Sequence, residues 1–107
     1  MAEIFHIAMR SDWDAACVAG GPYEISTRGS MLRDVGFIHG CRNAEQVAKV
    51  QQLFYADLDD LVLLVIDTDR LEAPVRYETA DGEVFPHIHG PLTLEAVIEV
   101  RPLPASR

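Results

Sequence analysis

Histidine occurs in three separate apolar segments of the sequence, and this is the first indication of a chemical site. His6 lies in a segment rich in strand-forming residues, His39 stands beside glycine in a second segment, and His87 lies in a third. Imidazole titrates near neutral pH and serves as general acid, general base and metal ligand. We predict that these three side chains converge on one concave site, although they are far apart in the sequence.

A phenylalanine precedes a histidine by two residues at two places. Phe37 precedes His39, and Phe85 precedes His87. In extended backbone, side chains two residues apart lie on the same face, so each pair would present an apolar ring beside a polar group. Ordinary core packing is one interpretation of such rings. The alternative is a pocket that holds a flat aromatic ligand, and it predicts that Phe37, His39 and His87 bind a small molecule.

Metal binding is a third possibility. His87 and His89 form a His-x-His pair, and a distant histidine with Glu78 would complete a plausible ligand set. The spacing has low specificity, because His-x-His often arises by chance. Glu78 itself follows a short strand-like segment, where a solvated carboxylate is the ordinary alternative. The sequence has no Gly-x-Ser-x-Gly nucleophile motif and no glycine-rich phosphate loop in a suitable context.

Composition narrows the classes of protein. A chain of 107 residues with 49% apolar residues is expected to form one domain over residues 1–107 with one continuous core. The formal net charge of −8 and nine scattered basic residues argue against a nucleic-acid partner, which would need clustered Lys and Arg. A small-molecule ligand is the expected partner, and the oligomeric state stays open.

Location follows from the apolar runs and the cysteines. The longest apolar run, residues 61–66, is far shorter than the roughly 20 residues that span a bilayer, and the N-terminus lacks a signal-peptide pattern. We expect a cytoplasmic protein without membrane contact. Cys17 and Cys41 match no zinc spacing, so two reduced thiols are expected in that compartment.

The elements that must position these residues follow from the pattern. We expect an α+β fold with a small twisted, mixed or antiparallel sheet of about five to six strands and two main helices. Strands are expected at residues 3–9, 36–40, 61–66, 75–78, 83–85 and 96–100, with 61–66 central in the sheet and a hairpin turn at Asp81-Gly82. Residues 23–35 are expected to form a long surface loop with a short strand near Tyr23. Residues 86–91 are expected to form a rigid, irregular segment bounded by prolines.

Two helices are expected. The first would begin after Ser11 as its N-cap residue and end at Gly20-Gly21-Pro22. Its expected buried face is Trp13, Ala16 and Cys17. The second would begin at an Asn43 N-cap with Gln46 in the third helical position. Its expected buried face is Val47, Val50 and Phe54, and its expected solvent face is Lys49, Gln51 and Gln52.

These segments together resemble the bacterial domain-of-unknown-function 952 family over nearly the whole chain. The resemblance is carried by Ile4-Phe5-His6-Ile7-Ala8, Gly36-Phe37-Ile38-His39, the strand at 61–67, Tyr77-Glu78 and, most specifically, Phe85-Pro86-His87-Ile88-His89-Gly90-Pro91-Leu92. Three positions depart from the family pattern. Val35 replaces an acid, Gly40-Cys41 replaces Cys-Ser, and His89 stands where Tyr is common, which argues against His89 as an obligatory ligand.

The family in turn resembles a small ADP-ribosyltransferase-like fold. That resemblance implies that His6 and His39 hold a nicotinamide dinucleotide such as NAD, and that Glu78 is catalytic and stabilises an oxocarbenium-like transition state. The related RNA 2′-phosphotransferases need several arginines for phosphate and RNA, and this acidic chain has no such cluster.

Three functional hypotheses remain open at this point. The first is a nucleotide-binding domain for NAD or an ADP-ribose-like ligand, with or without transferase or glycohydrolase activity. The second is a non-catalytic module that binds a small ligand or a protein. The third is a histidine-based metal-dependent enzyme. If Glu78 and His6 point into one cleft, catalysis stays possible; if Glu78 faces water, a binding role is favoured.

Overall fold

The computed structural model of the protein describes residues 2–106. Its elements, in chain order, are β1 (Glu3–Met9), α1 (Arg10–Ala19), β2 (Ile25–Thr27), β3 (Ser30–Met31), α2 (Leu32–Val35), β4 (Ile38–His39), α3 (Ala44–Phe54), β5 (Leu61–Asp67), the 3₁₀ turn η1 (Thr68–Arg70), β6 (Val75–Ala80), β7 (Glu83–Ile88), the 3₁₀ turn η2 (Leu94–Ala96) and β8 (Val97–Leu103). The α+β class is therefore confirmed.

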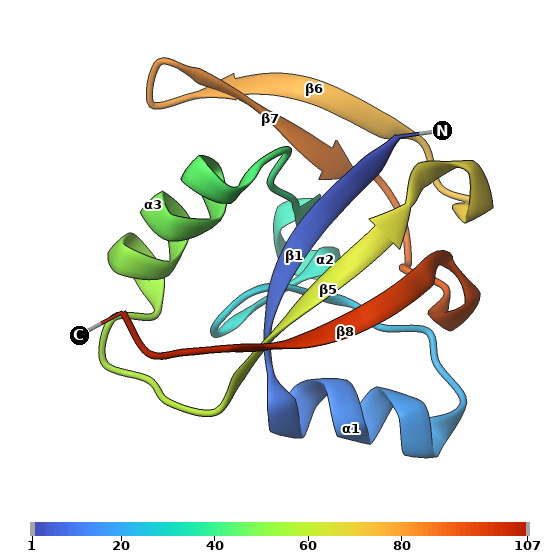
Figure 1. Ribbon diagram of the computed structural model, residues 1–107. Coiled ribbons are helices and arrows are strands. Elements are labelled where there is room, and N and C mark those ends of the chain that lie inside the picture. The colour runs from blue at the N-terminus through green and yellow to red at the C-terminus, as the bar shows by residue number, and fades with distance from the viewer. Residues whose placement is uncertain (1, 107) are drawn as a thin grey trace.

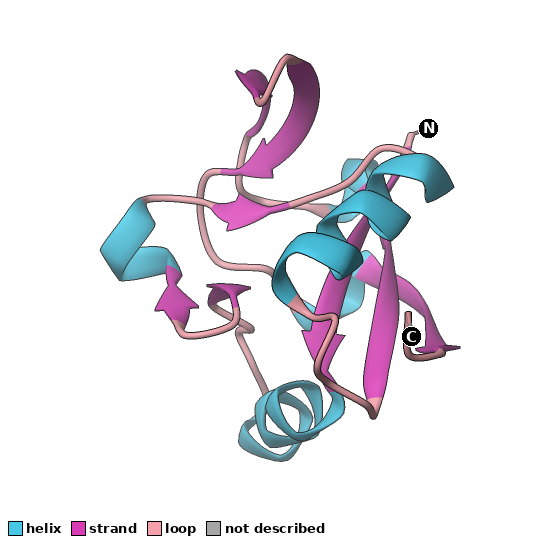
Figure 2. Ribbon diagram, turned by 90° about the vertical axis from the view of Figure 1, so that its left-hand side faces the viewer, coloured by secondary structure: helices cyan, strands magenta, loops and turns pink. Residues whose placement is uncertain are grey.

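The largest sheet has the order β1-β5-β8, and both pairings are antiparallel. Its central strand is β5, as its nearly continuous apolar sequence predicts. Figure 1 shows the three strands side by side with α1 near one end. In Figure 2 the same sheet lies behind α3, which covers one of its faces. The two faces lie against separate core clusters, one containing Val62, Leu64 and Ile66 and the other containing Leu61 and Val47.

A second antiparallel sheet has the order β4-β7-β6. Its β6–β7 hairpin turns at Asp81 (φ 51°) and Gly82 (φ 76°), as predicted, since a tight hairpin turn favours residues that tolerate positive φ. Two backbone hydrogen bonds of 2.7 Å, Phe5 N to Cys41 O and Cys41 N to Phe5 O, connect this sheet to β1 just beyond β4. The bridge brings the histidine-bearing strands of the two sheets close together.

The fold has more strands than expected. Within residues 2–106, eight strands form three sheets, in place of one sheet of five to six strands. The extra elements come mainly from residues 23–35, which we expected to be a loop and which contain the β2–β3 hairpin and α2. Tyr23 is buried and forms an isolated bridge with Leu92. Pairing between distant segments, which local periodicity does not reveal, orders this region.

The prediction of an irregular segment after residue 85 is wrong in its first half, because Pro86 lies inside β7 opposite Tyr77. The Pro86 carbonyl accepts a hydrogen bond from Gly40 N (2.9 Å). In an antiparallel pair, the N–H and C=O groups of one residue face the same neighbouring strand. The missing N–H of proline therefore faces the side where β4 has ended, and no hydrogen bond to β6 is lost. Ile88 and Leu92 are fully buried core residues, as predicted.

Helix α3 begins as predicted, with the Asn43 side chain accepting a hydrogen bond from Gln46 N (2.9 Å). Its expected burial is partly wrong. Phe54 is 46% exposed, whereas Gln51 is buried. The Gln51 amide donates to the Pro104 carbonyl (2.7 Å), which explains how a polar side chain is accommodated there.

Helix α1 begins one residue before the predicted cap, directly after β1, with Met9 as N-cap residue in place of Ser11. The Arg10 N–H donates to the Asp60 carbonyl (3.0 Å), so a neighbouring loop takes part in holding the helix start. Trp13 packs against the core as expected, but Cys17 is exposed and not on the buried stripe. Both cysteines are free thiols, as predicted.

Strand β8 is longer than the predicted 96–100 and runs through Pro102, which lies opposite Val62. It is the last strand of its sheet, and an edge strand tolerates proline because one side of its backbone makes no ladder hydrogen bonds. Across residues 2–106, the structure contains no helix with the length and apolar character that crossing a membrane requires.

Candidate functional site

Three polar side chains form a row across the second sheet. His39 on β4 lies opposite His87 on β7, and His87 lies opposite Arg76 on β6. Directly opposite residues share a face of an antiparallel sheet, so all three side chains project to the same side. The imidazole rings of His39 and His87 are 5.3 Å apart between centroids. This row is the central feature of the candidate site, and we call its face the imidazole face.

Aromatic rings flank the row. Phe37 stacks on His87 with ring centroids 4.0 Å apart and an interplanar angle of 16°. Phe85 contacts His39 at 5.1 Å between centroids. The two Phe–His pairs recognised in the sequence thus combine across strands, because each phenylalanine contacts the histidine of the other pair. Phe37 is half-buried, so its ring is the partly exposed cover of His87.

Glu78 lies on the same face and joins two histidines. Its Oε1 atom is 2.7 Å from His87 Nδ1 and 2.8 Å from His89 Nε2. These hydrogen bonds, with the one from His89 first, lower the pKa of the Glu78 carboxyl below its ordinary value. The carboxylate is therefore ionised at neutral pH. Because its side chain is 41% exposed, Glu78 faces both the imidazoles and water.

Two ring nitrogens of the row make no hydrogen bond to any residue of the described chain. These buried atoms are His39 Nε2 and His87 Nε2. A buried polar atom without a partner costs about 1–3 kcal/mol, so folded proteins keep few of them. Burial, and then the neighbouring His87, lower the pKa of His39 to about 4. Its ring is therefore neutral at pH 7 and able to accept or donate one further hydrogen bond, depending on its tautomer.

His6 does not join this row, contrary to the predicted convergence of three histidines. Its Nδ1 lies 2.7 Å from the His39 carbonyl oxygen, and its Nε2 lies 3.0 Å from the Tyr23 hydroxyl. The carbonyl can only accept, so His6 Nδ1–H donates to it and Nε2 accepts from the tyrosine. Burial lowers the pKa of His6 to about 4. His6 shares its strand face with the core residues Ile4 and Ala8, so packing directs it inward.

Arg76 is the residue that sequence reasoning missed. Its side chain is exposed, and no hydrogen bond or ion pair holds its guanidinium among the residues described here. The signal was present, since Arg76 precedes Glu78 by two residues in a strand and must share its face. A guanidinium on the same face as His39 and His87 is the kind of group that pairs with an anion.

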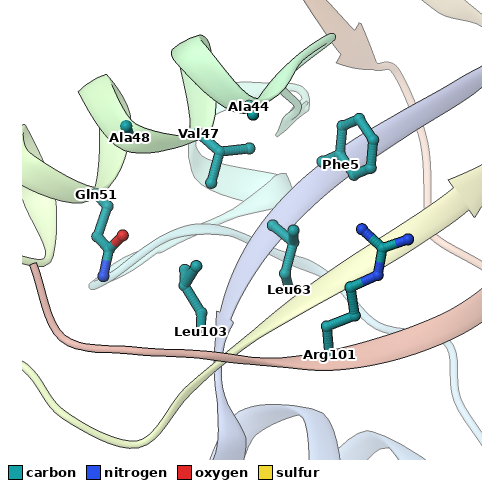
Figure 3. A pocket seen from close by; sticks show the side chains of 8 residues that line it. All are labelled: Phe5, Ala44, Val47, Ala48, Gln51, Leu63, Arg101 and Leu103. Atoms are coloured by element: carbon teal, nitrogen blue, oxygen red, sulfur yellow. The ribbon is translucent and has the colours of Figure 1, made fainter.

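A second candidate is the apolar groove between α3 and the largest sheet, which has a volume of about 270 Å³. In Figure 3, side chains of α3 face Phe5, Leu63 and Leu103 of the strands across this groove. Its polar groups are already engaged. Arg101 is paired with Glu99 through two hydrogen bonds of 2.7 and 3.1 Å, and the Gln51 amide donates to Pro104. The groove therefore has fewer free polar groups for ligand recognition than the imidazole face.

Comparison with known proteins places the chain in a family without an assigned role. No curated protein matches it. The crystal structure of protein CC0527 from Caulobacter crescentus has 29% sequence identity and a TM-score of 0.77, over 92% of this chain and 83% of that chain. The solution NMR structure of CC0527 has 30% sequence identity and a TM-score of 0.73, over 97% of this chain and 86% of that chain. The model of the family described as protein of unknown function (DUF952) matches residues 7–100, so this chain belongs to that family.

Proposed function

We propose that this domain binds a small anionic ligand with a flat ring, of the NAD or ADP-ribose class, on the imidazole face. The observation that carries this proposal is the row of His39, His87 and Arg76, in which two buried ring nitrogens and one guanidinium have no protein partner. A ligand that bonds to these groups recovers interactions that the folded chain leaves unmade, and this is a direct source of binding free energy.

Each part of the site has a role in this binding. Arg76 would pair with a phosphate of the ligand, because guanidinium and phosphate form bidentate, charge-assisted hydrogen bonds. The half-buried ring of Phe37, already stacked on His87, would extend its stack to a base or a nicotinamide ring. The Nε2 atoms of His39 and His87 are buried in the free protein, and they would bond to polar groups of the ligand once neighbouring side chains shift to admit it. Hydrogen-bonded strands hold these groups, so little order is lost on binding.

An ADP-ribosyltransferase-like architecture is the finer part of the proposal. It is supported by a histidine on β1, an aromatic residue in the following helix, a short strand ending in His39 and a later strand bearing Glu78. In such an enzyme the ionised Glu78 would stabilise the positive charge of an oxocarbenium-like transition state. Glu78 and His6 do not open into one cleft, because both nitrogens of His6 are engaged inside the core. A binding role is therefore the primary proposal, and ADP-ribosyl transfer or NAD hydrolysis by Glu78 is secondary.

Calorimetric titration with ADP-ribose, NAD and AMP tests the proposal. Arg76→Ala should weaken binding about tenfold or more, since a hydrogen bond to a charged group contributes about 1.5–3 kcal/mol. Arg101→Ala is the matched control, because it removes an arginine from the apolar groove and leaves the imidazole face intact. Equal losses in both variants, or no binding of any of the three ligands to the wild-type protein, would refute the proposed site.

The same samples decide whether catalysis accompanies binding. If Glu78 is catalytic, the wild-type protein releases nicotinamide from NAD and Glu78→Gln does not, while both bind ADP-ribose. If neither protein releases nicotinamide, the domain is a binding module under the conditions used.

A further inference from the structure

We propose that Glu78, His87 and His89 bind one divalent transition-metal ion of the zinc class, at the edge of the imidazole face. Each residue offers one donor atom, and these three atoms all lie within 4.8 Å of one another. The Glu78 Oε1 atom is close to both histidine nitrogens, at 2.7 Å from His87 Nδ1 and 2.8 Å from His89 Nε2. This cluster unites a carboxylate of β6 with the His-x-His pair that begins in β7.

The strands hold the three ligands in place. Glu78 lies opposite Phe85 in the β6–β7 hairpin, and β7 is the central strand of its sheet. His89 follows the end of β7, and its backbone N–H donates to the Pro74 carbonyl (2.9 Å). Backbone pairing therefore fixes the distances between the three Cα atoms, and only side-chain torsions remain to adjust. A rigid scaffold of this kind favours metal binding, since few degrees of freedom are lost.

The donor set fits a borderline metal. Two imidazole nitrogens and one carboxylate oxygen suit zinc and similar divalent ions, and they leave one position for water or a ligand atom. Donors bonded at 2.0–2.1 Å to one tetrahedral ion lie about 3.3 Å apart, so the two short contacts must open by roughly half an ångström. The site is accessible enough for this, with side-chain exposures of 41% for Glu78 and 24% for His89.

Metal binding would also change what His87 presents to a ligand. In the tautomer in which His87 Nδ1–H donates to Glu78, the Nε2 atom is an acceptor. In the tautomer that binds the metal through Nδ1, the proton lies on Nε2, which becomes a donor. Resting on the proposed function above, this predicts that the metal strengthens binding of an anionic ligand, since a phosphate or carbonyl oxygen accepts that hydrogen bond.

The direct test uses Zn²⁺ and Co²⁺ on protein carrying Cys17→Ser, which removes the exposed thiol as a competing ligand. We expect one Zn²⁺ per chain by calorimetry and visible absorption bands of bound Co²⁺. His89→Ala and Glu78→Gln should each weaken Zn²⁺ binding by more than the roughly 10–100-fold that the loss of an outer-shell partner costs, because each removes one of three direct ligands. Glu95→Gln is the control, since Glu95 is an exposed carboxylate that is not part of the cluster. Equal Zn²⁺ affinity in all four proteins would overturn the metal site.

A second titration separates this inference from the proposed function. ADP-ribose is titrated into wild-type protein and His89→Ala, each with EDTA and with saturating Zn²⁺. Tighter binding with Zn²⁺ in the wild type alone supports the coupling, and equal affinity in all four samples overturns it. If ADP-ribose binds in EDTA and the protein has no affinity for Zn²⁺, the metal site is refuted and the proposed function stands. If Zn²⁺ binds and ADP-ribose does not, the proposed function is refuted and the metal site stands.

Discussion

His6 on β1 and His87 on β7 are both almost fully buried, with exposed fractions of 2% and 5%, yet their surroundings differ in kind. Both ring nitrogens of His6 have protein partners, the His39 carbonyl and the Tyr23 hydroxyl. His87 has a partner only at Nδ1, and its Nε2 bonds to none of the residues between 2 and 106. Burial alone therefore does not distinguish a structural histidine from a functional one, whereas the state of each nitrogen does.

The difference extends to the two sheets. The β1-β5-β8 sheet has a core cluster against each face, and its histidine completes that packing. The β4-β7-β6 sheet uses one face for Ile38 and Ile88 in the core, and the other bears the polar row with Phe37, Glu78 and His89. We infer that the first sheet provides stability and that the second retains unused hydrogen-bonding capacity for binding.

The largest expected effect on stability comes from removing His6. His6→Leu leaves the His39 carbonyl and the Tyr23 hydroxyl buried without a partner, and we expect a loss of about 2–4 kcal/mol in unfolding free energy. His87→Leu removes a nitrogen that has no partner. Glu78 loses one hydrogen bond but keeps the one to His89 and is half-exposed to water, so we expect a loss below about 1.5 kcal/mol in unfolding free energy. Urea denaturation at pH 7 measures both. A larger loss of unfolding free energy in His87→Leu than in His6→Leu would contradict the assignment of His6 as the structural histidine.

A pH effect follows from the same histidine. The pKa of His6 falls from 6.5 to about 4 in the folded protein. As the pH falls, His6 is therefore protonated in the unfolded chain before it is protonated in the folded protein. The stability that this shift contributes is present above pH 6.5 and is lost as the pH falls towards 4. The full shift corresponds to about 3 kcal/mol. The difference in stability between wild type and His6→Leu should therefore narrow by about that amount from pH 7 to pH 4, as measured by denaturation at several pH values.

His39 has a similarly lowered pKa and is present in both proteins of that comparison, so its contribution cancels except for its coupling to His6, which hydrogen-bonds to the His39 carbonyl. A difference between wild type and His6→Leu that stays constant over this pH range would show that His6 is not buried in its neutral form.

Sequence reasoning succeeded where a local signal fixes the structure. The apolar run of β5, the Asn43 cap of α3 and the Asp81-Gly82 turn each depend on neighbouring residues alone. The β2–β3 hairpin was missed because Ile25 and Met31 gain their strand geometry from pairing and from the surrounding core. Local composition around them indicates only a loop.

The candidate site was predicted in part for a similar reason. The two-residue spacing of strands correctly grouped Phe37 with His39 and turned His87 and His89 away from Ile88. The same rule would have added Arg76 to Glu78. It could not place His6 relative to that group, because periodicity tells which side chains share a face but not which face meets the core.

Ring ¹⁵N spectra of the histidines during titration with ADP-ribose test the contrast between the two environments most directly. Each nitrogen reports whether it donates, accepts or changes partner. We predict that the Nε2 signals of His39 and His87 shift in proportion to bound ligand, while both signals of His6 stay unchanged. Shifts at His6 with none at His39 and His87, or no shift at any of the three at saturating ligand, would contradict the assignment of the binding site to the imidazole face.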